Sequence, residues 1–411
     1  MIRSQRWNMA ILKTVNPILL SQISIGLIIG SVIACSPIRF TPTENNAAIV
    51  CDGATSCVVS NGIVNISDNF QIGAGKVDIL FINDNSASMS PIQAQLALKF
   101  SGFIKNLDDR KIDYRIAITS TDLEAVKSKG LITFDNGKSF ISNTDANRFS
   151  LFNSAIIRPE TLNCETFITS MFNTYGSSFQ SRQDYAVGYP QNCASPDTRG
   201  IYTGNLVVSQ NTDSFIRTDA NLNIILISND DVRQGRYSND AKFSLLEADS
   251  ATGFTAMMSN QYPNKYWDFN SIIVKDASCE QKQILRNTQG QIIVNDYNQP
   301  SVSGGIGLEY ARLSNSPAKD IDQKLIPRGQ VLDICQLDYA QNFSKISVQI
   351  TDESRLFNLK CEATEAPTVV LAANPSQSVP STWDGKQRVV FQPGSEGTSV
   401  TVKYRCVQGP E

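Results

Sequence analysis

The sequence contains no histidine among its 411 residues. This absence excludes Ser-His-Asp and Cys-His catalysis, ordinary catalytic zinc sites and a histidine pH switch. The chain also lacks runs of lysine and arginine, and its formal net charge is -3, so no electrostatic footprint for nucleic acid is present. Since no activating base for a hydrolase can be identified either, the composition indicates a protein that is not an enzyme.

The length and composition predict a large domain with a smaller module attached. With 41% hydrophobic residues, the chain can bury a sizeable core. Changes in composition along the chain then divide it into a signal peptide, a polar tether with an early strand or two and a small disulfide loop, a main domain with insertions and a small β module. We place these segments at residues 1–34, 35–70, 71–360 and 361–411.

The N-terminal region predicts export and a lipid anchor. Basic residues precede an apolar stretch, 17–34, which ends directly before Cys35. Such a stretch is typical of a secretory signal, and its last four residues resemble the bacterial lipobox, in which the cysteine is lipidated. The alternative is a plain transmembrane anchor, for which this interrupted run is marginal. Ser36 after the cysteine favours the outer membrane of the bacterial envelope, and the side that the protein faces stays open.

Eight cysteines remain after Cys35, and an even number in an exported chain predicts disulfides. Many connectivities are possible, and the order along the chain suggests that neighbours pair. No C-x-x-C pair exists, so a metal-thiolate site is disfavoured. The suggested pairs are Cys51 with Cys57, Cys164 with Cys193, Cys279 with Cys335, and Cys361 with Cys406.

One short motif carries most of the functional information. Asp84, Ser86 and Ser88 form a D-x-S-x-S sequence directly after the apolar run 77–82. A carboxylate and two hydroxyls at alternate positions of a loop can point three oxygens at one hard divalent cation. The end of a strand is also where open α/β sheets bind their ligands. An ordinary polar turn is the alternative, because a motif this short also occurs by chance.

Hydrophobic periodicity predicts an α/β core. The strand 77–83 is followed by apolar positions at helical spacing between Ile92 and Leu107, and then by a strand at 114–119, which implies parallel pairing. After residue 361 the pattern changes to short strands, the last of which alternates apolar and polar residues. Further strands are expected at 222–227, 271–275, 369–373, 388–391 and 399–406, and helices at 147–158, 239–248 and 306–313.

Four motifs follow one another along the chain: K-V-D-I-L-F-I-N-D-N-S-A-S-M, Y-R-I-A-I-T-S-T-D, F-I-R-T-D-A-N-L-N-I-I-L-I-S-N-D-D and D-I-C-Q-L-D-Y-A. Their order resembles bacterial surface lipoproteins with a von Willebrand factor A domain, and the resemblance covers roughly residues 70 to 360. It implies a doubly wound, mostly parallel sheet with helices on both faces. It also implies a metal-ion-dependent adhesion site at the carboxyl ends of the strands.

The resemblance carries over to particular residues. Asp84, Ser86 and Ser88 match the family's first motif, and the family's threonine most resembles Thr174, in a loose alignment. Asp122 matches the family's T-D, or it only orients its loop.

The last acidic residue of the family pattern is where this chain departs from it. Asn229 stands in register, which would remove a negative charge and weaken cation binding. Asp230 or Asp231 could restore the charge by turning inward. The alternative for both is a helix cap or a solvated turn.

The implied chemistry is binding. A divalent ion, Mg²⁺ or else Mn²⁺ or Ca²⁺, would keep open positions that a partner's Asp or Glu can complete. We therefore expect a lipid-anchored binding protein for a protein or surface ligand that presents a carboxylate. The alternative is a structural or assembly subunit of an envelope complex with a vestigial metal site. The polar insertion from Cys164 to about Asn221 is expected at the surface, as a candidate for ligand specificity.

Overall fold

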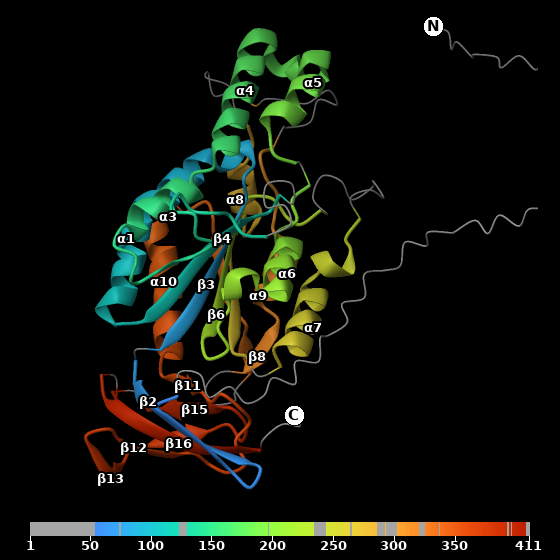
Figure 1. The fold of residues 1–411 in the computed structure, drawn as a ribbon. Coiled ribbons are helices and arrows are strands. Elements are labelled where there is room, and N and C mark those ends of the chain that lie inside the picture. The colour runs from blue at the N-terminus through green and yellow to red at the C-terminus, as the bar shows by residue number, and fades with distance from the viewer. Residues whose placement is uncertain are drawn as a thin grey trace, which may run out of the picture. The chain divides into compact units, whose positions relative to one another are not determined.

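A six-stranded sheet forms the centre of the computed structural model (Figure 1). Its order is β10-β7-β6-β3-β4-β5, and all neighbours are parallel except β4 and β5. The strands are β3 (Lys76–Asn83), β4 (Asp113–Ser120), β5 (Ile141–Ser142), β6 (Asn221–Ser228), β7 (Trp267–Ile273) and β10 (Val331–Asp333). The structure describes residues 54–73, 75–122, 130–195, 197–233, 244–263, 265–285, 292, 302–319, 325–336, 338–392, 394–395 and 397–407.

The register brings three loops to one edge of the sheet. Asn83 at the end of β3 stands opposite Ser120 of β4 and Ile227 of β6. Because parallel strands end on the same side, the chain leaves all three strands at the same edge. The D-x-S-x-S motif follows β3 there, and Asn229 follows β6.

Helices cover both faces of the sheet, because successive side chains of a strand point to opposite sides. Phe81 of β3 packs in one buried cluster with α1, α3 and α10, and Ile82 packs in another with α6, α7 and α9 (Figure 1). The chain is thus a mixed α/β protein. These helices are α1 (Ser90–Asp109), α3 (Arg148–Ile156), α6 (Gly200–Gln210), α7 (Ala251–Gln261), α9 (Leu308–Ser314) and α10 (Tyr339–Glu353).

Helix α1 follows the predicted spacing. Pro91 lies in its first turn, where a missing N–H costs nothing. The buried rings of Phe100 and Phe103 meet Phe81 edge to face, at centroid distances of 6.4 and 6.3 Å. Each such ring contributes about 1.5–3 kcal/mol through burial, so the helix is held on the sheet mainly by this side.

Most other expected elements are confirmed, with two differences. The helices expected at 147–158 and 306–313 correspond to α3 and α9. The strand expected at 271–275 begins earlier, as β7, because buried Asp268 and Asn270 hide its start from an apolar pattern. Of the helix expected at 239–248, residues 239–243 lie outside the described residues, and the rest forms only the one-turn η6 (Glu247–Asp249).

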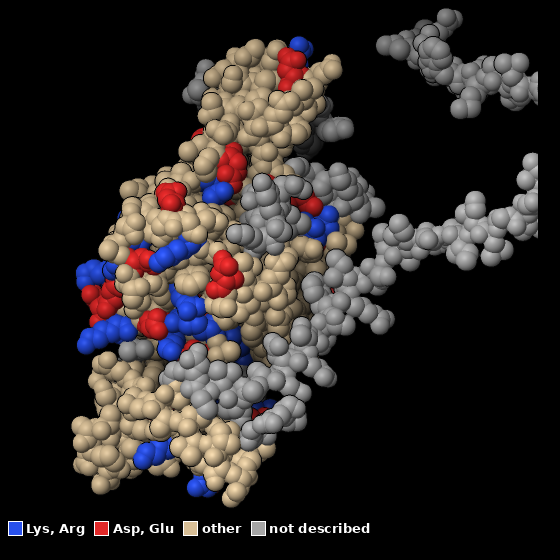
Figure 2. All heavy atoms as spheres, viewed as in Figure 1, with Lys and Arg blue, Asp and Glu red and all other residues tan. Residues whose placement is uncertain are grey.

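The insertion between Cys164 and Asn221 is only partly superficial. Helices α4 (Pro159–Tyr175) and α5 (Gln183–Asn192), joined by η3 (Gly176–Ser181), form a hairpin at the top of Figure 1. On the face that Figure 2 shows, this hairpin carries few charged side chains. The surface expectation is wrong for α6, which buries Ile201, Val207 and Val208 against the sheet. The sequence did not reveal this helix, because its run of apolar residues is short, is interrupted by Gly and Asn, and lies in a polar segment.

The small β module takes strands from both ends of the described chain. Strand β2 (Ile63–Gln71) pairs antiparallel with β16 (Ser399–Val407) over its whole length. The one or two early strands expected within the tether are present as β1 and β2, and β2 is stabilised by a pairing partner more than 300 residues away. The expected alternation in β16 is confirmed by buried Val400, Val402 and Tyr404.

The remaining strands complete three smaller sheets. The module's first sheet has the order β1-β2-β16-β12-β13 and its second β11-β15-β14, while β8 and β9 pair separately. Their bounds are β1 (Ser56–Ser60), β8 (Pro317–Lys319), β9 (Leu325–Pro327), β11 (Leu356–Asn358), β12 (Thr368–Leu371), β13 (Asn374–Ser378), β14 (Ser381–Trp383) and β15 (Arg388–Phe391). Short helices are η1 (Ala87–Met89), η4 (Thr212–Ser214) and α8 (Ala277–Lys282).

Three of the four expected disulfides are present in the described part of the chain. They join Cys164 to Cys193, Cys279 to Cys335, and Cys361 to Cys406, which confirms the pairing of sequence neighbours. Cys51 lies outside the described residues, as do Cys35 and the whole expected signal peptide. Among the helices that the structure describes, none combines the length and apolar character needed to cross a membrane.

Candidate metal site

Asp84 is the fixed centre of the loop after β3. It is 1% exposed, and its backbone nitrogen donates to the carbonyl of Ile227 at 3.0 Å. Its Oδ1 accepts from the backbone nitrogen of Ser86 at 2.8 Å, and its Oδ2 accepts from Ser228 Oγ at 2.6 Å. The carboxylate is therefore held between the ends of β3 and β6.

The surroundings of Asp84 make its charge costly. Burial raises the pKa of Asp84, and the nearby charge of Asp122 raises it further, while hydrogen bonds from Ser228 and Ser86 lower it. Removing a carboxylate from water disfavours its charged form, and a cation beside it offsets that cost. The site thus provides a negative charge that a bound cation would stabilise.

Three further side chains near Asp84 place their oxygen atoms in a row, each close to the next. Ser86 Oγ lies 3.1 Å from Ser88 Oγ, which lies 3.3 Å from Asn229 Oδ1. Mg²⁺ takes octahedral oxygen ligands at about 2.0–2.1 Å, so adjacent ligand oxygens stand roughly 3 Å apart. The spacing and the chemistry of these donors fit such an ion.

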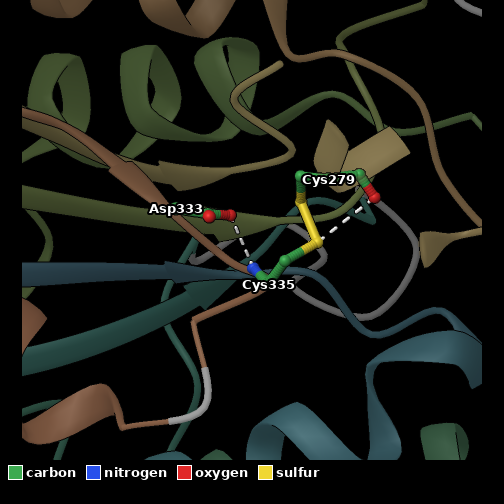
Figure 3. Close-up of side chains that lie close together, drawn as sticks. All are labelled: Cys279, Asp333 and Cys335. Atoms are coloured by element: carbon green, nitrogen blue, oxygen red, sulfur yellow. Dashed lines mark hydrogen bonds between the residues drawn. A yellow bond between two sulfur atoms is a disulfide. The ribbon is translucent and has the colours of Figure 1, made fainter. Parts of the chain in front are cut away.

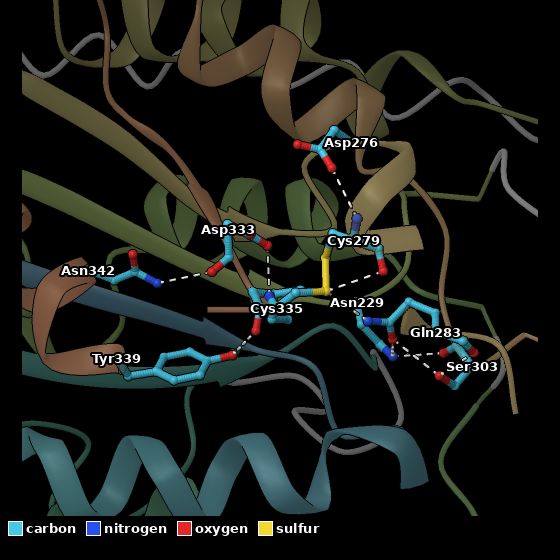
Figure 4. The surroundings of a disulfide bond; sticks show 10 residues. Asn229, Asp276, Cys279, Gln283, Ser303, Asp333, Cys335, Tyr339 and Asn342 are labelled. Carbon is cyan, nitrogen blue, oxygen red and sulfur yellow. Dashed lines mark hydrogen bonds between the residues drawn. A yellow bond between two sulfur atoms is a disulfide. The ribbon is translucent and has the colours of Figure 1, made fainter. Parts of the chain in front are cut away.

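Asn229 belongs to this site. It is 1% exposed and directly follows β6. Its Nδ2 donates to the carbonyl of Ser303 at 2.7 Å and to Oε1 of Gln283 at 3.2 Å (Figure 4). The same nitrogen lies 3.1 Å from Ser88 Oγ. The residue in register with the family's last acidic position is thus brought to the motif as a neutral amide.

The two following aspartates lie differently. Asp230 is half-buried, and its backbone nitrogen donates to Ser228 Oγ at 3.1 Å. Asp231 accepts from the backbone nitrogen of Glu309 with both carboxylate oxygens, at 3.1 and 3.2 Å, in the first turn of α9. Burial raises the pKa of Asp231 to about 6. The helix-capping interpretation therefore holds for Asp231.

Thr174 is not brought to the site. It is exposed near the end of α4, where its hydroxyl donates to the carbonyl of Ser170 at 2.9 Å. Thr161, in the first turn of α4, is the threonine beside the motif: its hydroxyl donates to the carbonyl of Asn85 at 2.8 Å. The two threonines are thirteen positions apart in the helix, which corresponds to about 20 Å. The assignment of Thr174 is corrected because the site meets the beginning of α4.

Asp122 supports the neighbouring loop. It is buried after β4, and its Oδ2 accepts from the backbone nitrogen of Ser195 at 3.1 Å. It thereby ties the loop after β4 to the segment before α6. Its charge still contributes to the raised pKa of Asp84, so it acts on the site electrostatically.

A second group of metal-ligating residues surrounds a disulfide. Ligand atoms of Cys279, Asp333 and Cys335 lie within 4.8 Å of one another (Figure 3). The two sulfur atoms are bonded to each other, and Asp333 Oδ1 accepts from the backbone nitrogen of Cys335 at 2.8 Å. Since thiolates are the sulfur ligands of metals, the disulfide form offers no thiolate there.

Sequence reasoning missed three residues that shape the site. Ser228 and Gln283 contact its members through hydrogen bonds, and Thr161 donates to the carbonyl of Asn85, which lies between Asp84 and Ser86. Ser228 stands at the end of an unmistakable strand, so its position gave a usable signal. Gln283 offered none, because it follows a short helix far along the chain.

Comparison with known proteins assigns no family. No protein-family model matches the chain, and no curated protein matches it. Crystal structures of SpaC, a pilus adhesin from Lactobacillus rhamnosus GG, align over 85% of this chain with 10% identity and TM-scores of 0.33 (open conformation) and 0.34 (a second form). The human COPII-coat protein Sec24c aligns over 84% with 7% identity and a TM-score of 0.28.

The chain spans less than half the length of these proteins, 41% and 42% of the two SpaC chains and 42% of the Sec24c chain. Likenesses this distant identify neither a family nor a function.

Proposed function

We propose that this chain is a von Willebrand A-type binding protein that uses a metal-ion-dependent adhesion site to bind a protein or surface ligand presenting a carboxylate. One observation carries the proposal: oxygens of Ser86, Ser88 and Asn229 are spaced as ligands of one hard cation beside buried Asp84. The position of the site, at the carboxyl edge of a mostly parallel sheet, supports it.

Asp84, Ser86, Ser88 and Asn229 are the residues that would hold the ion. When bound, Mg²⁺ supplies residual positive charge and open positions for a carboxylate. With one carboxylate in the set, the charge count is low, which favours weak binding that the partner's carboxylate strengthens. The protein's own contribution is to keep the oxygens in place, through the contacts of Asp84 with Ser228 and of Asn229 with Gln283.

Calorimetric titration of Mg²⁺, Mn²⁺ and Ca²⁺ into the full chain in mild detergent tests this site. Wild type should show saturable binding that Asp84→Ala abolishes. Asp135→Ala removes an exposed aspartate elsewhere and should bind as wild type does. Absence of saturable binding in wild type, or its persistence in Asp84→Ala, would overturn the proposal.

We further propose that the protein is exported and lipid-anchored at Cys35 in the bacterial outer membrane. The lipobox-like sequence before Cys35 supports this, and more than one acyl chain gives a stable anchor. Labelling cells with a radioactive fatty acid should mark wild type and leave Cys35→Ser unlabelled. Equal labelling of both proteins would contradict the anchor.

The second candidate is a scaffold subunit of an envelope complex. Asn229 favours it, because this neutral residue replaces a charged ligand and its amide is engaged by Gln283 and Ser303. If chelator and Asp84→Ala both leave the protein's native complexes unchanged on a blue native gel, the scaffold is supported. If the chelator and Asp84→Ala both dissociate the same complex, the adhesion-type site is supported.

A further inference from the structure

The orientation of the Asn229 side-chain amide is fixed by the hydrogen bonds that its nitrogen donates. Its Nδ2 lies 2.7 Å from the carbonyl oxygen of Ser303 and 3.2 Å from Oε1 of Gln283 (Figure 4). A backbone carbonyl only accepts hydrogen bonds, so the atom that faces it is the nitrogen. The other terminal atom of the amide is therefore the oxygen Oδ1, which lies 3.3 Å from Ser88 Oγ.

Gln283 is itself held in a defined orientation. Its Oε1 also accepts from Ser303 Oγ at 3.2 Å, and its Nε2 donates to Cys335 Sγ at 3.3 Å. Cys335 is bonded to Cys279 in α8, and Gln283 directly follows that helix. Gln283 thus connects the disulfide to Asn229, since it donates to Cys335 and accepts from Asn229 (Figure 4).

We propose that Gln283 is a positioning residue that holds Asn229 as a neutral oxygen ligand, in a site built for an amide and not for a carboxylate. The proposal rests on the proposed metal-binding function and identifies which residue after β6 completes the ligand set. It also explains the departure from the family pattern. An aspartate at position 229 would point an acceptor oxygen at Ser303 O and Gln283 Oε1, both of which are acceptors.

Titrations of Mg²⁺ into the full chain in mild detergent compare two glutamines at and beside the end of α8. Gln283→Leu removes the acceptor and should weaken binding about tenfold, as loss of a residue supporting a metal ligand does. Gln283→Glu keeps an acceptor oxygen and should restore most of the affinity. Gln281→Leu makes the same change at an exposed position and should have no effect. Unchanged affinity in Gln283→Leu, or an equal loss in Gln281→Leu, overturns the proposal.

Asn229→Asp gives a second and opposite expectation. Counting ligand charges alone predicts tighter Mg²⁺ binding by this variant. If the surroundings are built for an amide, binding is no tighter than in wild type. Affinity at least tenfold higher in Asn229→Asp would show that the site accepts a carboxylate and would overturn the proposal.

The metal-free protein supplies an independent measurement. NMR spectra of the apo protein should contain an Asn229 side-chain amide, assigned by its loss in Asn229→Ala, with slow hydrogen exchange. Exchange should accelerate in Gln283→Leu and stay slow in Gln281→Leu. If wild type binds no metal, the proposed function fails, yet this exchange still decides whether Gln283 positions Asn229. Exchange that is the same in Gln283→Leu and wild type refutes the positioning role.

Discussion

Ser228 Oγ donates a hydrogen bond of 2.6 Å to Oδ2 of Asp84, so the last residue of β6 holds the carboxylate that follows β3. The same hydroxyl oxygen accepts from the backbone nitrogen of Asp230 at 3.1 Å. Ser228 and Asp84 are both buried. A hydrogen bond to a charged group is stronger than one between neutral groups, so this contact couples the two loops of the site.

Ser228→Ala should destabilise the protein. The change leaves a buried carboxylate without one of its donors, which costs about 1–3 kcal/mol. Urea denaturation at pH 7 measures the free energy of unfolding. Ser154→Ala, at an exposed position of α3, is the matched control and should change it little. Equal stability of Ser228→Ala and wild type would contradict the importance of this bond.

Two threonine variants test which end of α4 supports the site. Thr161→Val keeps the shape of the side chain but leaves the carbonyl of Asn85 and Nε2 of Gln93 without this partner. It should lower the free energy of unfolding by about 1–3 kcal/mol and weaken Mg²⁺ binding. Thr174→Val makes the same change on an exposed turn and should do neither. Thermal denaturation and calorimetry measure both effects, and a larger effect from Thr174→Val would reverse the assignment.

A buried carboxyl pair at the other end of the sheet should make stability depend on pH. Burial raises the pKa of Asp268 to about 6, and burial together with the charge of Asp268 raises the pKa of Glu353 well above its ordinary value. Both groups bind protons more tightly in the folded state. Their contribution is therefore most favourable below the unfolded pKa values of about 4, and stability falls as the pH rises through 6.

Glu353→Gln removes one of these charges. It should raise the free energy of unfolding at pH 8 and have a smaller effect at pH 4. Urea denaturation at the two pH values measures the difference. Glu362→Gln is exposed and serves as the control. If Glu353→Gln destabilises the protein more at pH 8 than at pH 4, the sign of this coupling is wrong.

The disulfide between Cys164 and Cys193 should matter mainly to the α4–α5 hairpin. It closes 29 residues of sequence separation, for which loop entropy predicts about 3–4 kcal/mol. The double variant Cys164→Ser/Cys193→Ser should be cleaved by trypsin after exposed Arg182 faster than wild type. Cys361→Ser/Cys406→Ser lacks a bridge in the β module and should leave this cleavage rate unchanged. Mass spectrometry of timed digests identifies the cut.

Several features were predictable because they depend on local order. The apolar run of β3 and the spacing in α1 place the D-x-S-x-S loop at the end of a strand, as expected. Alternation along β16 identified its buried face. The disulfide pairs followed from sequence order, since each pair that the structure describes joins neighbouring cysteines.

Other features required partners that are distant in sequence. The choice of Thr161 over Thr174 depends on which end of α4 meets the loop after β3. Asp231 could be recognised as a cap only once α9 was placed beside it. Strand β2 forms because β16, at the other end of the described chain, supplies its hydrogen-bond partners.

The sequence by itself determined the elements of this protein: the periodicity of its strands and helices, the three oxygens of the D-x-S-x-S loop and the absence of histidine chemistry. Each of these features depends on residues that are close together in the sequence, within about one or two helical turns or one strand. Only the tertiary structure decided that Ser228 and Gln283 contact the site, and that Asn229, which the resemblance had left as an alternative to Asp230, lies beside Ser88. Parallel pairing of β3 with β6 brings residues more than 140 positions apart to one edge, and hydrogen-bond geometry at that edge selects the side chains.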